Sequence, residues 1–180
     1  SLLSKPKIFE IFKLANKAIL MSLSHSKRIN AGPYDLGNAD TEDIIYSNNK
    51  EFNWRPFQLA YFLQVLPSLL NPDHDDRKLV DVIWFPTGGG KTEAYLFLSA
   101  FELIQRRYFY GDKGLGVGVI NRYTYRFLSM DQFQRTSIMI CALELLRREQ
   151  FNLGNKNIGE KPFSIGLFVG ADISPNSFSA

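Results

Sequence analysis

A run of glycines followed by lysine and threonine is the part of this sequence best suited to chemistry. Gly88, Gly89, Gly90, Lys91 and Thr92 stand between an apolar segment and a segment with helical spacing. Glycines let successive backbone N–H groups converge on one anion, because no Cβ atom interferes. The start of a helix adds unpaired N–H groups and the positive end of its dipole. The sequence therefore predicts a phosphate-binding loop.

The side chains of this loop suit a nucleotide that carries magnesium. We expect Lys91 to bind the β- and γ-phosphates and Thr92 to offer its hydroxyl to Mg²⁺, an ion that takes few protein ligands. These two residues would serve catalysis. Thr87 and the three glycines after it would line the phosphates. The full pattern has a further glycine where this chain has Phe85, so the alternative is a glycine-rich turn that binds nothing.

The elements that must position this loop have the patterns of an α/β fold. Residues 79–85 form an apolar run rich in β-branched and aromatic side chains, and the run ends at Pro86 as a buried strand would. Residues 116–121 and 163–170 have a similar character. Strands that alternate with helices are typical of a parallel sheet flanked by helices. We therefore predict part of a P-loop NTPase domain with such a sheet.

Four further segments have apolar residues at helical spacing, which predicts helices packed on a core. These segments are residues 5–24, 54–70, 92–108 and 127–148. The pattern dissolves between residues 26 and 53, where polar turns indicate a linker or a lightly packed loop. We therefore divide the chain into an N-terminal helical extension with its linker, residues 1–50, and the first part of a larger domain, residues 51–180.

Composition places the chain among ordinary globular proteins. It has 180 residues, 45% of them hydrophobic, and a net charge of only +3, which neither requires nor excludes nucleic acid. The single cysteine, Cys141, rules out an intrachain disulfide and lies at helical spacing from Leu145, so we expect both on a buried helix face. No apolar run reaches the roughly 18 residues of a membrane span. We expect a cytoplasmic protein without membrane contact.

A second group of polar residues follows the second predicted strand. Arg122, Thr124 and Arg126 come directly after residues 116–121. Ligands of an α/β sheet gather at the carboxyl ends of its strands, so these side chains should share a rim with the phosphate loop. Arginine and hydroxyl groups are typical ligands of a nucleic-acid backbone. The alternative is a charged, solvated loop.

A glutamine stands at the start of the second predicted helix, about 30 residues before the loop. The amide of Gln58 can both donate to and accept from an adenine edge. We therefore predict a contact with the base of the nucleotide. The alternative is an ordinary helix start, because Pro56 suits the first position of a helix.

These motifs resemble those of superfamily 2 helicases. Residues 85–92 are similar to motif I, which often lacks the first glycine in that superfamily, and residues 55–58 resemble its adenine-reading glutamine motif. Residues 121–126 occupy the place of motif Ia, which grips the strand backbone, and residues 169–172 stand near the place of motif Ib. A closer likeness is to the DrmA-type helicases of DISARM bacterial antiphage systems. The segments that carry this likeness are residues 54–60, 84–95, 122–128 and 132–135.

The resemblance implies an ATP-dependent helicase or translocase that uses ATP and Mg²⁺ and acts on nucleic acid, DNA rather than RNA. It implies a RecA-like fold, a second RecA-like domain as partner, and partner proteins of the defence system. The acidic box that holds Mg²⁺ in the family would follow residue 180, so we expect this chain alone to be inactive. Two alternatives remain: a P-loop ATPase switch that does not bind nucleic acid, and a non-catalytic nucleic-acid-binding module.

Overall fold

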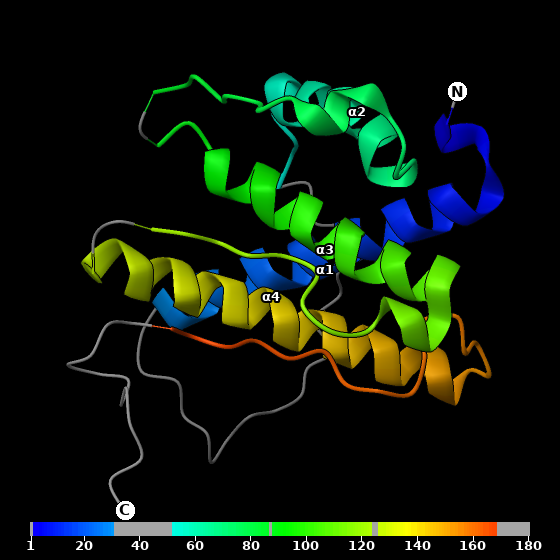
Figure 1. Ribbon diagram of the computed structural model, residues 1–180. Helices are drawn as coiled ribbons and strands as arrows, with labels where there is room; N and C mark the ends of the chain where they lie inside the picture. Colours follow the sequence, from blue (N-terminus) through cyan, green and yellow to red (C-terminus); the bar gives the residue numbers. More distant parts are fainter. Residues whose placement is uncertain (1, 31–51, 87, 124–125, 169–180) are drawn as a thin grey trace, which may run out of the picture.

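The protein is a bundle of helices in the part of the chain that the structure describes. This computed structural model describes residues 2–30, 52–86, 88–123 and 126–168 (Figure 1). Its helices are α1 (Pro6–Asn30), α2 (Pro56–Leu70), α3 (Lys91–Tyr110) and α4 (Arg126–Asn152), with the short 3-10 helices η1 (Leu2–Ser4), η3 (Asp75–Lys78) and η4 (Gly111–Gly114). None of the described helices combines the length and the apolar character that crossing a bilayer requires.

Helix α1 forms the centre of the packing. It lies against both α3 and α4, and α2 packs on α3, above it in Figure 1. The apolar stripe that the sequence predicts on this helix is buried, which confirms the prediction of a packed amphipathic helix. Its fully covered members are Ile8, Ile11, Ala15, Ala18 and Ile19. The core therefore joins the N-terminal helix to the helices of the second half of the chain.

Aromatic side chains fill the centre where three helices meet. The Phe97 ring of α3 lies 4.9 Å from the Phe62 ring of α2 and 5.5 Å from the Phe12 ring of α1, measured between ring centroids. Trp54 packs edge-on against Phe97 and donates from Nε1 to the side-chain amide oxygen of Asn16 at 2.6 Å. These contacts fix the start of α2, from which Arg55 and Gln58 reach the glycine loop.

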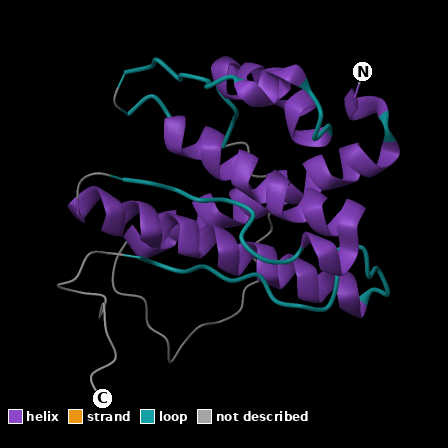
Figure 2. Cartoon of the chain, viewed as in Figure 1, coloured by secondary structure: helices purple, strands orange, loops and turns teal. Residues whose placement is uncertain are grey.

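The predicted parallel sheet is wrong for this structure, and so is the RecA-like α/β fold. None of the described residues lies in a strand, and the three apolar segments at 79–85, 116–121 and 163–168 run as loops (Figure 2). Val80 is 88% exposed and Trp84 is 91% exposed. A buried strand needs hydrogen-bonded neighbouring strands and side chains that cover both of its faces. The described residues provide neither for these segments. Contacts among the helices form the core instead.

The predicted core face of α4 is right in part. Of the face that carries Ile138, Cys141, Ala142, Leu145 and Leu146, Ala142 and Leu146 are buried as predicted, whereas Cys141 is exposed and Leu145 is 52% exposed. Met139 and Leu143 are buried beside Ala142 and Leu146. Apolar residues occur around most of this helix, so its spacing does not select one face. Packing against α1 decides which side of α4 is covered.

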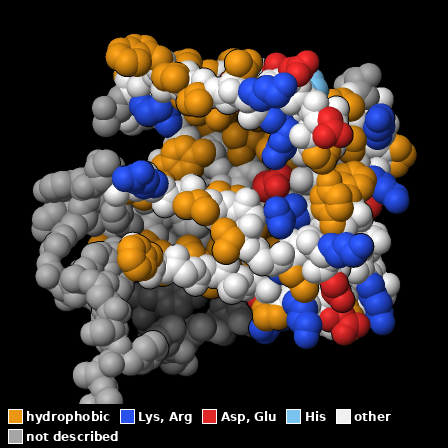
Figure 3. Space-filling view, viewed as in Figure 1, with side chains coloured by type: hydrophobic (Ala, Val, Ile, Leu, Met, Phe, Trp, Pro, Cys, Tyr) orange, Lys and Arg blue, Asp and Glu red, His pale blue; other side chains and the backbone are white. Residues whose placement is uncertain are grey.

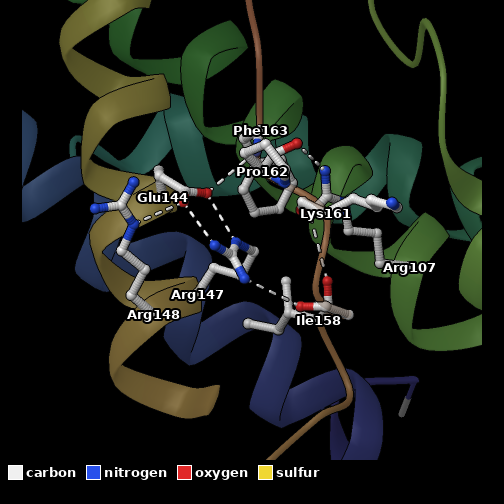
Figure 4. A network of polar contacts seen from close by, with 9 residues as sticks. Arg107, Glu144, Arg147, Arg148, Ile158, Lys161, Pro162 and Phe163 are labelled. Atoms are coloured by element: carbon white, nitrogen blue, oxygen red, sulfur yellow. Dashed lines mark hydrogen bonds and ion pairs between the residues drawn. The ribbon is translucent and has the colours of Figure 1, made fainter. Parts of the chain in front are cut away.

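A buried arginine holds the segment after α4 against α3. The Arg107 guanidinium donates to the backbone carbonyls of Ile158, Lys161 and Pro162, at 3.3, 2.5 and 2.9 Å (Figure 4). It also lies 3.6 Å from the centre of the Phe163 ring. Burial lowers the pKa of Arg107, and five N–H donors in a planar group suit several carbonyls at once. The arginine thereby replaces backbone pairing as the anchor of this segment.

A carboxylate on α4 completes the same anchor. Glu144 accepts from Arg147 at 2.6 Å, from Arg148 at 2.8 Å and from the backbone N–H of Phe163 at 3.2 Å (Figure 4). The bond from Arg147, with the bonds from Arg148 and Phe163, lowers the pKa of Glu144 from 4.5 to about 2. The carboxylate is therefore charged at neutral pH and ties α4 to the chain that leaves it.

Candidate functional site

The glycine loop adopts a backbone conformation that requires glycine. Gly88 has a φ of +77° and Gly90 a φ of +84°, both in the left-handed region that side chains disfavour. Gly90 is also the N-cap of α3, and a Cβ atom there would lie 2.8 Å from the Gln58 side-chain nitrogen. Thr87 lies outside the described residues. The loop therefore leads directly into a helix N-terminus, as the sequence predicts.

Lys91 points back into the loop. Its ammonium donates to the backbone carbonyls of Phe85 at 2.5 Å and Pro86 at 2.9 Å. The N–H of Gly89 donates to the same Pro86 carbonyl at 3.1 Å, which closes a tight turn. The ammonium thus lies inside the loop that we predict to hold phosphate. Its acceptors are neutral, so an anionic oxygen would be a stronger partner.

The start of α2 braces the loop from one side. The Gln58 amide oxygen accepts from the Arg55 backbone N–H at 2.8 Å, and its nitrogen donates to the Gly90 carbonyl at 2.7 Å. The Arg55 guanidinium donates to the Gly89 carbonyl at 3.0 Å. Gln58 is only 5% exposed, and both ends of its amide have partners. Contact with adenine would have to replace one of these bonds, and this contact stays a prediction.

A pocket of 590 Å³ opens between the start of α2 and the glycine loop. The rings of Phe57 and Phe85 stack in its wall, with centroids 3.9 Å apart. Its volume lies in the range of small-molecule sites. Hydrophobic side chains gather at the upper left of Figure 3, over the segment between α2 and α3. The residues that line the pocket are Arg55, Pro56, Phe57, Phe85, Pro86, Gly88 and Gly89.

Thr92 belongs to a hydrogen-bond network that we did not predict from the sequence. The Tyr95 hydroxyl lies 3.0 Å from the Thr92 hydroxyl and 2.6 Å from the amide oxygen of Gln132 on α4. Nearby, Arg135 of α4 pairs with Glu93 in the first turn of α3. The spacing of Thr92 and Tyr95, three residues apart on one helix face, is the signal that could have revealed the first contact.

The predicted nucleic-acid rim is only partly within the described residues. Arg122 is exposed, whereas Thr124 and the side chain of Arg126 lie outside them. The neighbouring Tyr123 is half-buried and lies close to Tyr95. Burial, and to a lesser extent Tyr95, raises the pKa of the Tyr123 hydroxyl. The residue beside Arg122 therefore lies near the helix that carries Lys91 and Thr92, although strand binding itself stays a prediction.

Comparison with known proteins gives a clear similarity over nearly the whole chain. The chain is 38% identical, over 175 residues and 94% of its own length, to the DISARM protein DrmA of Bacillus paralicheniformis. It spans only 15% of the length of that protein. No protein-family model matches the chain. The predicted resemblance to DrmA is confirmed as a sequence similarity over 94% of this chain.

Proposed function

We propose that this chain is the nucleotide-binding part of an ATP-dependent helicase or translocase that acts on DNA in bacterial antiphage defence. The observation that carries the proposal is the glycine loop with Lys91 inside it, which opens beside the pocket and leads into α3. The similarity to a DISARM protein supports the defence role. The resemblance of residues 85–92 to helicase motif I supports the reaction class.

The residues of the site fit ATP with Mg²⁺. Lys91 can exchange two neutral carbonyl acceptors for phosphate oxygens, since charge-assisted hydrogen bonds are the stronger ones. The first N–H groups of α3 have no partners within the helix, and Gly90 provides no side-chain cap. Thr92 would hold the magnesium ion, which neutralises charge on the phosphates. The stacked rings of Phe57 and Phe85 offer a flat apolar surface for the base.

The direct test measures ATP binding by the purified chain with a fluorescent ATP analogue. Lys91→Ala removes the ammonium from the loop. We expect the affinity for ATP to fall roughly tenfold or more, because one charge-assisted contact is lost. Lys113→Ala is the matched control because Lys113 is exposed on η4 and has the same charge. Equal affinities of wild type and Lys91→Ala would contradict the proposed site.

Binding of a DNA strand is tested separately, with labelled single-stranded DNA at several salt concentrations. Arg122→Ala and Arg126→Ala should each weaken binding and lower the slope of log affinity against log salt by about 0.7, as expected for one lost phosphate contact. Lys113→Ala again changes the net charge by the same amount at an exposed position. An unaltered affinity and slope in both arginine variants would exclude the rim, even if ATP binding holds.

A further inference from the structure

We infer that Tyr95 and Gln132 set the direction of the Thr92 hydroxyl proton and thereby keep the oxygen lone pairs of Thr92 free for a magnesium ion. The inference rests on the proposed function and deepens it, because it assigns two positioning residues to the metal ligand. The inference follows from which side-chain atoms can donate a hydrogen bond and which can only accept one. The donor and acceptor of each contact can be assigned in turn, starting from Asp131.

Asp131 determines the orientation of the Gln132 amide. One side-chain atom of Gln132 lies 2.9 Å from a carboxylate oxygen of Asp131, and the other lies 2.6 Å from the Tyr95 hydroxyl. An ionised carboxylate only accepts, so the atom that faces Asp131 must be the amide nitrogen. The amide oxygen therefore faces Tyr95. Gln132 is 5% exposed, so its surroundings hold this orientation.

The oxygen of Gln132 then determines what Tyr95 does with its proton. A tyrosine hydroxyl has one proton, and an amide oxygen can only accept. Tyr95 must therefore donate to Gln132 across the 2.6 Å contact. Its proton is then used, so the 3.0 Å contact with Thr92 requires that Thr92 donates and that Tyr95 accepts.

Tyr123 lies close to the same Tyr95 hydroxyl. Burial, and to a lesser extent the neighbouring Tyr95, raises the pKa of the Tyr123 hydroxyl, so Tyr123 keeps its proton. Tyr95 has a single proton, which already goes to Gln132, and so it has no second proton for Thr92.

The consequence for Thr92 is a hydroxyl whose proton points toward Tyr95. Its lone pairs then point elsewhere, and lone pairs are what a magnesium ion binds. A hydroxyl free to rotate would have to be fixed in this orientation when the ion arrives. Tyr95 and Gln132 fix the orientation beforehand, although neither residue need contact the metal.

The test measures the affinity for ATP in the presence of Mg²⁺ and in the presence of EDTA. The ratio of these two affinities is the contribution of the metal to binding. Tyr95→Phe removes the acceptor for the Thr92 proton, so we expect the ratio to fall about fivefold, the effect of one hydrogen bond, with metal-free affinity unchanged. Tyr123→Phe removes a neighbouring hydroxyl that does not contact Thr92, and should leave both affinities unchanged. Gln132→Met removes the amide acceptor at similar volume, and should lower the ratio although Gln132 makes no contact with Thr92.

Other results would contradict either the positioning role or the proposed ATP site, and they can be told apart. If Tyr95→Phe binds ATP with an unchanged metal ratio, the positioning role is wrong while the proposed ATP site stands. If Tyr95→Phe and Tyr123→Phe weaken metal-free binding equally, the network only supports the fold, and the inference fails. If the wild-type chain binds no ATP under either condition, the proposed function fails and the inference with it. Thermal unfolding of each variant verifies that it is folded.

Discussion

The carboxylate of Glu144 should make the stability of this protein depend on pH in the acid range. Its pKa lies near 2 in the folded protein against an ordinary value of 4.5, chiefly because Arg147 donates to it. At about 1.4 kcal/mol per pKa unit, the whole shift corresponds to roughly 3 kcal/mol. Arg148, the second donor, is largely exposed, so solvent screening reduces this figure to about 1–2 kcal/mol.

The perturbation is Glu144→Gln, which keeps the shape of the side chain and removes its charge. Because the folded pKa is depressed, the carboxylate contributes stability above pH 4.5 and loses it as the pH falls toward 2. We therefore expect the variant to lose about 1–2 kcal/mol of unfolding free energy at pH 7. The difference from wild type should shrink steadily between pH 4.5 and pH 2.5.

The assay is urea unfolding at pH 7, 5, 4, 3 and 2.5, followed by circular dichroism. Glu149→Gln is the matched control, because Glu149 pairs with Lys17 at 2.9 Å where both side chains are substantially exposed. Its effect should stay below about 0.5 kcal/mol. A loss in Glu144→Gln that is the same at pH 7 and pH 3 would refute the electrostatic reasoning and assign the effect to packing.

Three further predictions concern the loop, the pocket and the core. Gly90→Ala should cost about 1 kcal/mol more unfolding free energy than Gly154→Ala, because both have positive φ but only Gly90 lacks room for a Cβ atom; equal losses in urea unfolding would contradict this. Phe57→Ala should weaken ATP binding about fivefold in the fluorescence assay, whereas Phe9→Ala, at an exposed ring, should not. Phe97→Ala should lose about 3–5 kcal/mol in urea unfolding, since the ring is fully buried among aromatic partners; a loss below 1 kcal/mol would refute its central place in the core.

The helices could be predicted from the sequence because each has its own local signal. The spacing of apolar residues placed α2, α3 and α4 within about four residues of their observed bounds, whereas α1 continues to Asn30, into the stretch predicted as a linker. The observed α2 even continues through Pro67 to Leu70, because the tertiary contacts of the helix outweigh the missing hydrogen bond. Local periodicity was sufficient wherever one helix face meets a core.

The sheet could not be predicted reliably, because a strand depends on neighbours that its own residues do not specify. The apolar run at residues 79–85 has strand composition, yet Val80 and Trp84 are exposed and no ladder forms among the described residues. Composition shows what a segment can form, whereas pairing depends on which other segments lie alongside it. The same reasoning explains why Cys141 and Leu145 of α4 are exposed although they were predicted to be buried.

The candidate site was predicted in part for a similar reason. The glycines and Lys91 are adjacent in sequence, so their motif is readable without a fold. Tyr95 and Gln132 are 37 residues apart and meet only because α3 packs near α4. Arg107 reaches carbonyls more than 50 residues away by the same route. Such contacts depend on packing, which residue spacing does not encode.

The two tryptophans of this chain lie in very different surroundings, and this gives the molecule two built-in optical reporters. Trp84 is 91% exposed and directly precedes Phe85 in the pocket wall, so its emission should be red-shifted and readily quenched by acrylamide. Trp54 is half-buried against Phe97, and its emission should shift to the red only when the helices separate. In Trp54→Phe, the fluorescence of Trp84 alone would report ligand binding at the pocket. In Trp84→Phe, the fluorescence of Trp54 alone would report unfolding. Neither measurement needs an attached dye.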